Sequence, residues 1–289
     1  MSRLFPMAMV LVLTVAPVAE AQTKRRVFVL HSGMHIILAH PDPNSAGLSL
    51  KKQLVGRGIN NRDIILLDSP FPRASFKEMV PRAGLILYLE SADPASGFAQ
   101  DAYVRLDKTL KARGITANDD IVWIGHSAGG QIGMTMAHLA HHRKKFPALA
   151  KKTVGYRFDT VITLGTAYGA NTTPADVKLR FYYSAGDTMI YFLSKHGDVV
   201  ADSVKSKVRF RTLCKPAPNV LTRVFFDVEH PSWCHENRVI DCILNEFDKP
   251  RNAPWRRTHV EASCSMALGQ LISRALEAEL RISLEDRRR

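Results

Sequence analysis

The chain has 289 residues, and its 40 lysines and arginines against 27 acidic residues give a formal net charge of +13. A surface this basic favours anionic surroundings such as envelope polymers, acidic lipids or acidic substrates, but it does not determine a fold. We expect a loose association with anionic envelope surfaces. The sequence contains no nucleic-acid-binding motif, so we expect no nucleic-acid partner.

The first 21 residues have the features of a secretory signal peptide. Arg3 gives a short positive start, and the apolar run over 7–19 is too short and too proline-broken for a good membrane span. Ala19, Glu20 and Ala21 then fit the small-x-small cleavage pattern. We expect a soluble protein exported to the periplasm or the medium after cleavage near Ala21. An uncleaved N-terminal anchor is the alternative.

Short apolar runs alternate with helical patterns along the rest of the chain. Strands are predicted at 26–30, 63–67, 121–124, 160–164, 179–185 and 222–228, and helices at 99–114, 131–145 and 236–247. The strand segments are apolar throughout, which is typical of strands buried on both faces. They predict an α/β fold with a mostly parallel central sheet flanked by helices. Residues 22–289 then form one domain, with a C-terminal helical tail from about 248 to 289.

The segment from 186 to 221 is less regular than the rest of the chain. Within it, Lys205, Lys207, Arg209 and Arg211 recur at every second position, as on one face of an exposed strand. Because charged side chains protect a strand edge against aggregation, we interpret this stripe as a solvated edge.

Ser127 lies between two glycines where the third predicted strand meets the helix that follows. Gly125-His126-Ser127-Ala128-Gly129 fits the pattern Gly-x-Ser-x-Gly, which occurs by chance about 0.1 times in a chain of this length. A serine on such a sharp turn needs small residues two positions away, because larger side chains would collide. The free N–H groups of the helix N-terminus can then receive a developing oxyanion. The pattern therefore indicates a catalytic serine.

The sequence GHSAGG resembles the nucleophile elbow of the α/β-hydrolase superfamily, in the version seen in lipases and esterases. The resemblance implies a triad in the chain order Ser, then Asp or Glu, then His, with each partner just past a strand. Asp187 follows the fifth predicted strand and is the expected acid, with Asp198 as the runner-up. His230 follows the last strand and is the expected base. His235 and His259 are nearby alternatives that do not directly follow a strand.

The resemblance also implies two backbone N–H donors for an oxyanion. One is Ala128, the residue after the nucleophile. The other is Gly33 or Met34, because this chain has His-Ser-Gly after its first strand where family members often have His-Gly followed by the donor. In addition, VITLGTAYGA is similar to the lipase strand that ends Leu-Gly-Thr-Pro, with Ala167 in place of the proline.

The four cysteines, Cys214, Cys234, Cys242 and Cys264, all lie in the last third of the chain. An even count in an exported chain predicts at least one disulfide bond, and three connectivities are possible if all four residues pair. Cys242 lies inside an apolar run and is alternatively a buried free thiol.

Two further features receive a structural interpretation. His138 and His142 are four residues apart, a spacing that can bind a metal, but no carboxylate accompanies them. We therefore expect no metal site there. Trp233, close to the expected base, is interpreted as a packing residue.

Together these features predict an exported serine hydrolase that cleaves carboxylic esters, of the esterase or lipase type, through an acyl-enzyme. Its substrate is a small-molecule or lipid ester, and the chemistry requires no metal or organic cofactor. An acyltransferase, thioesterase or peptidase would use the same triad. A non-catalytic exported binding protein that has kept the fold is an alternative of a different class.

Overall fold

The computed structural model describes residues 24–33, 45–68, 83–169, 173–184, 187, 190, 198–199, 201–211, 217–225, 228–229 and 232–247. The predicted signal peptide and the predicted C-terminal tail lie outside these residues. None of the helices within the described ranges is both long and apolar enough to span a bilayer.

Six parallel strands form the central sheet, in the order β2-β1-β3-β4-β6-β8. Their bounds are β1 (Arg26–His31), β2 (Ile64–Leu67), β3 (Asp120–His126), β4 (Arg157–Leu164), β6 (Lys178–Ser184) and β8 (Val220–Phe225). All six overlap a predicted strand, so the predicted α/β class and parallel sheet are confirmed. The four inner strands are buried along most of their length, as continuous apolar runs require.

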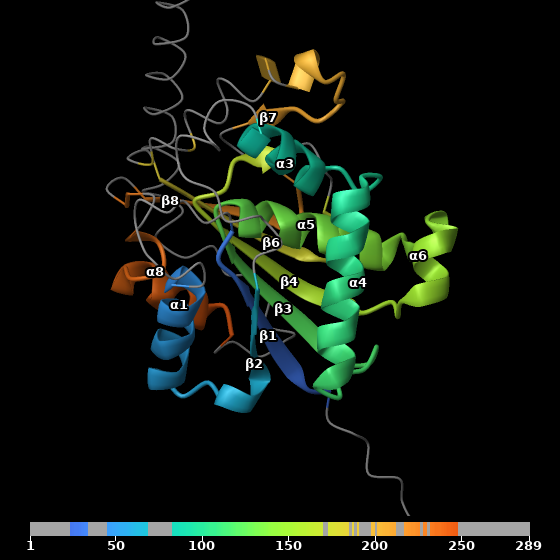
Figure 1. Ribbon diagram of the computed structural model, residues 1–289. Helices are drawn as coiled ribbons and strands as arrows, with labels where there is room; N and C mark the ends of the chain where they lie inside the picture. Colours follow the sequence, from blue (N-terminus) through green and yellow to red (C-terminus); the bar gives the residue numbers. More distant parts are fainter. Residues whose placement is uncertain are drawn as a thin grey trace, which may run out of the picture.

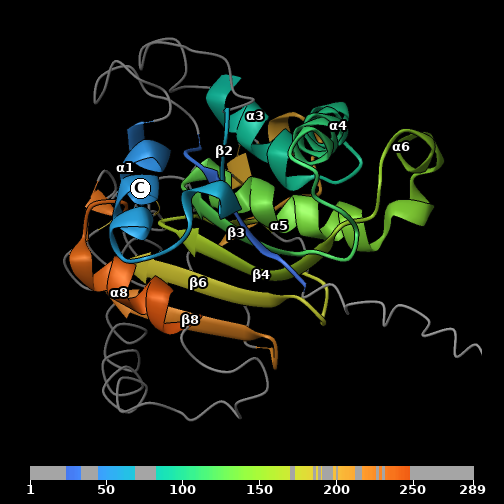
Figure 2. The ribbon, with the colours of Figure 1, turned by 90° about the horizontal axis from the view of Figure 1, so that it is seen from below.

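Helices cover both faces of the sheet (Figures 1 and 2). One face carries α3 (Ala83–Ala92), α4 (Gly97–Ala112), α5 (Ala128–His141) and α6 (Pro147–Lys152); the other carries α1 (Ser45–Gly56) and α8 (Asn237–Asn245). Each inner strand sends alternate side chains to the two faces. In β3, Ile121 and Trp123 join the core under α4 and α5, while Val122 and Ile124 join the core under α1 and α8.

Short elements complete the described part of the chain. They are the 3-10 helices η1 (Asn61–Asp63) and η2 (Arg143–Lys145), and a two-stranded antiparallel pair of β5 (Tyr168–Gly169) and β7 (Phe210–Arg211). The three predicted helices are present as α4, α5 with η2, and α8, with ends shifted by up to three residues. α1, α3 and α6 were not predicted.

The predicted exposed strand over 205–211 is wrong for its first part. Lys205 has a φ of 55°, which no extended strand accommodates, and β7 begins only at Phe210. The Arg209 guanidinium instead donates to Asp202 Oδ1 at 2.6 Å and to the Ser206 carbonyl at 2.7 Å. Local polar contacts within a turn therefore replace the alternating pattern of a strand.

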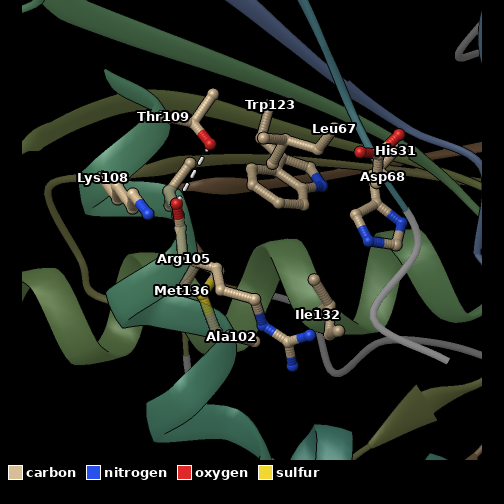
Figure 3. Close-up of a pocket in the computed structure, with 11 residues that line it drawn as sticks. His31, Leu67, Asp68, Ala102, Arg105, Lys108, Thr109, Trp123, Ile132 and Met136 are labelled. Carbon is tan, nitrogen blue, oxygen red and sulfur yellow. Dashed lines mark hydrogen bonds between the residues drawn. The ribbon is translucent and has the colours of Figure 1, made fainter. Parts of the chain in front are cut away.

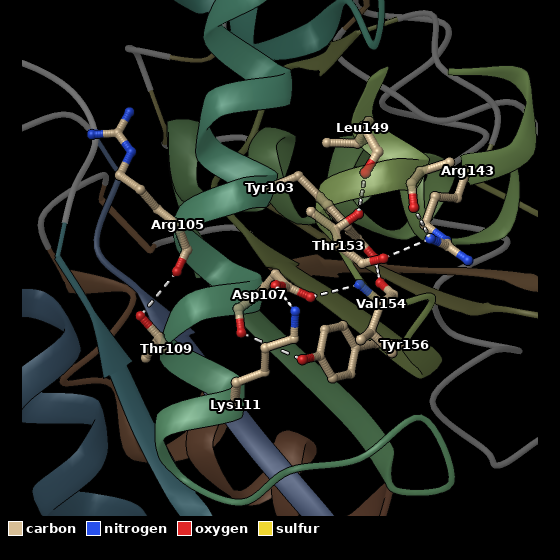
Figure 4. A network of polar contacts seen from close by, with 11 residues as sticks. Tyr103, Arg105, Asp107, Thr109, Lys111, Arg143, Leu149, Thr153, Val154 and Tyr156 are labelled. Carbon is tan, nitrogen blue, oxygen red and sulfur yellow. Dashed lines mark hydrogen bonds and ion pairs between the residues drawn. The ribbon is translucent and has the colours of Figure 1, made fainter. Parts of the chain in front are cut away.

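A polar network holds α4 against the segment that connects α5 to β4 (Figure 4). The buried Asp107 carboxylate accepts the Val154 N–H at 2.7 Å and pairs with Lys111 at 2.6 Å. The Tyr103 hydroxyl donates to the Val154 carbonyl at 2.8 Å. Arg143 donates to two carbonyl groups in the same connection. These carbonyl groups therefore have hydrogen-bond partners although they lie outside the sheet.

The strand order reverses direction at the centre of the sheet. From β1 the chain passes to β2 on one side, and it returns through β3 to continue as β4, β6 and β8 on the other. In open parallel sheets, ligands bind outside the carboxyl ends of the strands at such a switch point. The loop after β1, with Gly33, and the turn after β3, with Ser127, meet at this point.

Candidate active site

Ser127 occupies a strained turn between β3 and α5. Its φ of 54° and ψ of −127° make it one of two non-glycine residues with positive φ in the described ranges. Its N–H donates to the Leu164 carbonyl at 2.8 Å, and its own carbonyl accepts the Thr166 hydroxyl at 2.8 Å and the Gly130 N–H at 3.0 Å. Such a conformation costs about 1–3 kcal/mol and persists only when the surroundings hold it, which these three bonds do.

The glycines of the motif are required by close backbone contacts. A Cβ on Gly125 would collide with the Gly129 carbonyl, and a Cβ on Gly129 would collide with the His31 carbonyl at the end of β1. A Cβ on Gly130 would collide with the Thr166 hydroxyl that binds Ser127. The sharp turn therefore packs the first turn of α5 directly onto three strand ends, and only glycine leaves room for that approach.

The Ser127 side chain does not cap α5, although serine often caps a helix at this position. It forms no capping hydrogen bond to α5, and the residue is 8 % exposed. An ordinary N-cap serine would accept an N–H of the first helical turn. The turn instead leaves the hydroxyl disengaged from its own helix, as a nucleophile requires.

Asp187 lies just past the end of β6 and is buried, with 2 % of its surface exposed. Its Oδ2 accepts the indole N–H of Trp233 at 2.8 Å, and its Oδ1 accepts the Ile190 N–H at 3.2 Å. Gly165, at a φ of 54°, follows β4 and lies against both Trp233 and the Asp187 carboxylate. Because the carbonyl of Leu164, the preceding residue, accepts the Ser127 N–H, Asp187 and Ser127 lie on either side of the end of β4.

The strand order and the elbow form a recognisable arrangement. A serine at the apex of a strand–turn–helix faces the loop after the neighbouring strand, and Asp187 lies two strands further on. This arrangement is similar to the one expected of the α/β-hydrolase fold.

Comparison with known proteins gives a likeness to α/β-hydrolases in structure alone. No protein-family model matches the chain, and no curated protein sequence matches it. Similar solved structures include a predicted CIB-like hydrolase from Thermoplasma acidophilum, at 15 % identity and a TM-score of 0.41, covering 78 % of this chain and 87 % of that one. Esterase B from Lactobacillus rhamnosis is 13 % identical with a TM-score of 0.44, covering 78 % of this chain and 75 % of that one. At these values the function has to be argued from the site itself.

The expected base, His230, lies outside the described residues, but both flanks of its loop are described. The N–H of Val228 donates to Ser184 Oγ, at the end of β6, at 3.1 Å. On the other flank, Trp233 donates to Asp187. Both flanks of the segment that contains His230 are therefore hydrogen-bonded to residues at or just past the end of β6.

Trp233 is a functional candidate that the sequence interpretation missed. It is fully buried and packs edge-on against Phe225, with ring centroids 5.5 Å apart. Packing was expected, but its hydrogen bond to Asp187 was not. A buried indole N–H needs an acceptor, and the position of Trp233 three residues after His230 could have indicated which one.

The loop after β1 approaches the elbow from the other side. Gly33 has a φ of 80°, and a Cβ there would collide with the His126 carbonyl. Its N–H donates to His31 Nδ1 at 3.0 Å. Burial lowers the pKa of His31 to about 3, so this imidazole is neutral and accepts at Nδ1. Met34, the other expected donor, lies outside the described residues, while Ala128 begins α5 as expected.

The remaining candidates lie apart from this arrangement. Asp198, the runner-up acid, is more exposed than Asp187. His138, His141 and His142 pack ring against ring, and His141 Nδ1 lies 3.2 Å from Asp176 Oδ1. The described residues contain no cluster of three or more potential ligands that could hold a metal ion.

The two described cysteines, Cys234 and Cys242, do not form a disulfide with each other. Cys234 is buried, which raises the pKa of its thiol to about 12, and Cys242 is half-buried. Cys214 and Cys264 lie outside the described residues. The expectation of a disulfide is therefore not met by a pairing of Cys234 with Cys242.

Proposed function

We propose that this chain is a serine hydrolase that cleaves carboxylic esters through a covalent acyl-enzyme. One observation carries the proposal: the strained Ser127 lies beside a strand end that also contacts the buried Asp187 carboxylate. Strain of this kind is retained where it serves a function. A serine hydroxyl also needs a base oriented by an acid before it becomes a nucleophile, and Asp187 supplies that acid.

His230 is the proposed base. Ser127 Oγ attacks the ester carbonyl carbon, His230 accepts the hydroxyl proton, and the same imidazole then protonates the leaving alcohol. Asp187 orients the imidazole and stabilises its charged form. The chain order supports this assignment, because His230 is two residues from Val228, which donates to Ser184, and three from Trp233, which donates to Asp187.

The oxyanion is proposed to bind the N–H of Ala128 and one N–H from the loop after β1. Because the Gly33 N–H already donates to His31 Nδ1, Met34 is favoured as the second donor. Each such donor contributes about 10²–10³ to kcat. Water then attacks the acyl-enzyme with His230 as the base, which releases the acid and restores Ser127.

The bond that is cleaved and the molecule that accepts the acyl group distinguish an esterase from related enzymes with the same triad. Acyltransferases, thioesterases and peptidases pass through the same acyl-enzyme, so the triad supports each of them equally. We propose a small-molecule or lipid ester as substrate, and export after cleavage near Ala21 as the route by which the basic protein reaches anionic envelope surfaces.

Labelling by a fluorophosphonate tests the proposal. Wild-type protein should react irreversibly, and Ser127→Ala and His230→Ala should each abolish the reaction. His235→Ala is the matched control, because His235 lies in the same loop, is exposed and contacts Ser49 instead of the site. Folded wild-type protein that stays unlabelled would refute the proposal and favour a non-catalytic binding protein on this fold.

A further inference from the structure

A cavity lies between the sheet and the helices on one face. Its volume is about 340 Å³, within the range of small-molecule sites. It is lined from the ends of β1 and β2, the middle of β3, and the facing sides of α4 and α5 (Figure 3). Neither Ser127 nor Asp187 is among the lining residues, so this cavity is distinct from the proposed catalytic site.

The inner wall of the cavity is apolar. Trp123, Leu106, Ile132 and Met136 line it, and each is at most 2 % exposed. One water occupies about 30 Å³ in the liquid, so the volume accommodates on the order of ten non-hydrogen atoms.

The rim of the cavity on α4 carries two cations. Arg105 and Lys108 are exposed and three residues apart, so they lie on the same side of the helix. Neither forms an ion pair with any described residue. Lys111, on the same helix, instead pairs with Asp107. Figure 3 shows the Arg105 guanidinium extending toward Ile132, with Trp123 and His31 on the sheet side. Asp68, also at the cavity, already has a partner.

His31 adds no charge at the inner end of the cavity. His31 is neutral because it is buried, and its Nδ1 accepts the Gly33 N–H, so the ring proton is on Nε2. Its ring stacks on Trp123, with centroids 5.6 Å apart and an interplanar angle of 21°. An anionic group of a ligand with an apolar body is therefore favoured at Arg105 and Lys108, and it is disfavoured near the Asp68 carboxylate beside His31 (Figure 3).

We propose that this cavity binds a small amphipathic carboxylate. Its apolar body packs against Trp123, Ile132 and Met136, and its carboxylate pairs with Arg105 and Lys108. Arginine matches a planar carboxylate in a two-pronged geometry, and the exposed lysine adds a second positive charge. This binding does not depend on the chemistry proposed for Ser127.

Calorimetric titration with three ligands of one shape tests the proposal. 3-Phenylpropionate should bind with a Kd at or below about 1 mM. Its neutral amide should bind about tenfold more weakly, because the charge-assisted bonds are lost. The cation 3-phenylpropylamine should not bind. The titration is performed on wild-type protein and on Ser127→Ala, so that binding is read without turnover.

Charge-reversing variants on α4 locate the binding site. Arg105→Glu should weaken 3-phenylpropionate binding about tenfold or more. Arg113→Glu is the matched control, because it changes the net charge equally at the exposed end of the same helix, away from the cavity. At physiological salt its effect should stay within about twofold. Ala102→Leu, which fills the cavity from α4, should abolish binding without lowering the unfolding temperature.

The proposal is overturned if the amide binds as tightly as the carboxylate, or if Arg105→Glu and Arg113→Glu act equally. Absence of heat at millimolar 3-phenylpropionate overturns it as well. If Ala102→Leu does not fold, the pair of charge reversals decides the question. Fluorophosphonate labelling is independent of all these titrations, so failure of this proposal and failure of the proposed function are separately visible.

Discussion

Replacement of Trp233 by phenylalanine isolates the hydrogen bond that holds the proposed acid. The indole N–H donates to Asp187 Oδ2 at 2.8 Å, and both residues are almost fully buried. Phenylalanine keeps an aromatic ring but leaves a buried carboxylate oxygen without this donor. A hydrogen bond to a charged group contributes about 1.5–3 kcal/mol, and the free energy of unfolding should fall by that amount. In the proposed mechanism Asp187 orients His230, so loss of this bond should also raise the activation free energy of fluorophosphonate labelling. A rise of about 1.4 kcal/mol corresponds to a tenfold slower reaction, so labelling should slow by at least about tenfold.

The control for this prediction is Phe225→Leu. Phe225 packs edge-on against Trp233, so the substitution removes packing from the same cluster while the bond to Asp187 stays. Both variants should lose stability in urea unfolding, but only Trp233→Phe should lose labelling rate. If folded Trp233→Phe reacts as fast as wild type, or if both variants slow equally, Trp233 is a packing residue and the reasoning about Asp187 is wrong.

Three further predictions concern the elbow and its surroundings. Thr166→Val removes the hydroxyl that donates to the Ser127 carbonyl and should lower the free energy of unfolding by about 1–3 kcal/mol, measured in urea. Gly129→Ala should abolish labelling, because its Cβ would strike the His31 carbonyl, whereas Gly56→Ala meets open space and should label normally and unfold at an equal or higher temperature. His31 should make stability fall below pH 6.5: its pKa is about 3 when folded and 6.5 when unfolded, so only the unfolded state takes up the proton in this window. The loss between pH 7 and pH 5 is about 2 kcal/mol, and His31→Asn, which removes the titrating group, should flatten that part of the curve.

Strands were the part of the fold that the sequence predicted best. Each inner strand is a short run of apolar, mostly β-branched or aromatic residues, and burial on both faces of a parallel sheet leaves few other structures for such a run. The ends were less certain: β4 begins at Arg157, three residues before the predicted strand, because Arg157 pairs in register with Asp120 at the start of β3. That pairing depends on a neighbouring strand and is not visible in a single segment.

The helices that were missed have two physical reasons. α3 contains the run Leu85–Tyr88, which as a short apolar stretch does not distinguish a buried helix from a strand. α1 contains two glycines and two serines, which are weak helix formers. It forms because Leu50 and Leu54 pack into the core and because the Gly47 N–H donates to Ser32 Oγ. Packing from outside the segment overrides its local preference.

For the candidate site, sequence reasoning identified residues on single motifs and missed contacts between motifs. Ser127 and Asp187 follow strands and could be placed by chain order. The bond from Trp233 to Asp187 joins residues 46 positions apart, and a sequence pattern carries no distance across such a separation. The Gly33 N–H similarly proved to donate to His31, which no spacing rule indicated.

The reversal of strand order between β1 and β3 has a consequence for redesign of the protein. In the proposed mechanism the loop after β1 donates a hydrogen bond to the substrate oxyanion. The segments after β4, β6 and β8 hold the residues that transfer and stabilise the proton. The two tasks thus fall on opposite halves of the polypeptide, joined at the elbow. In the proposed mechanism, substitutions in the loop after β1 therefore act on oxyanion binding and leave the proton-transfer residues unchanged. Changes in the second half propagate through the bonded unit of Val228, Ser184, Trp233 and Asp187.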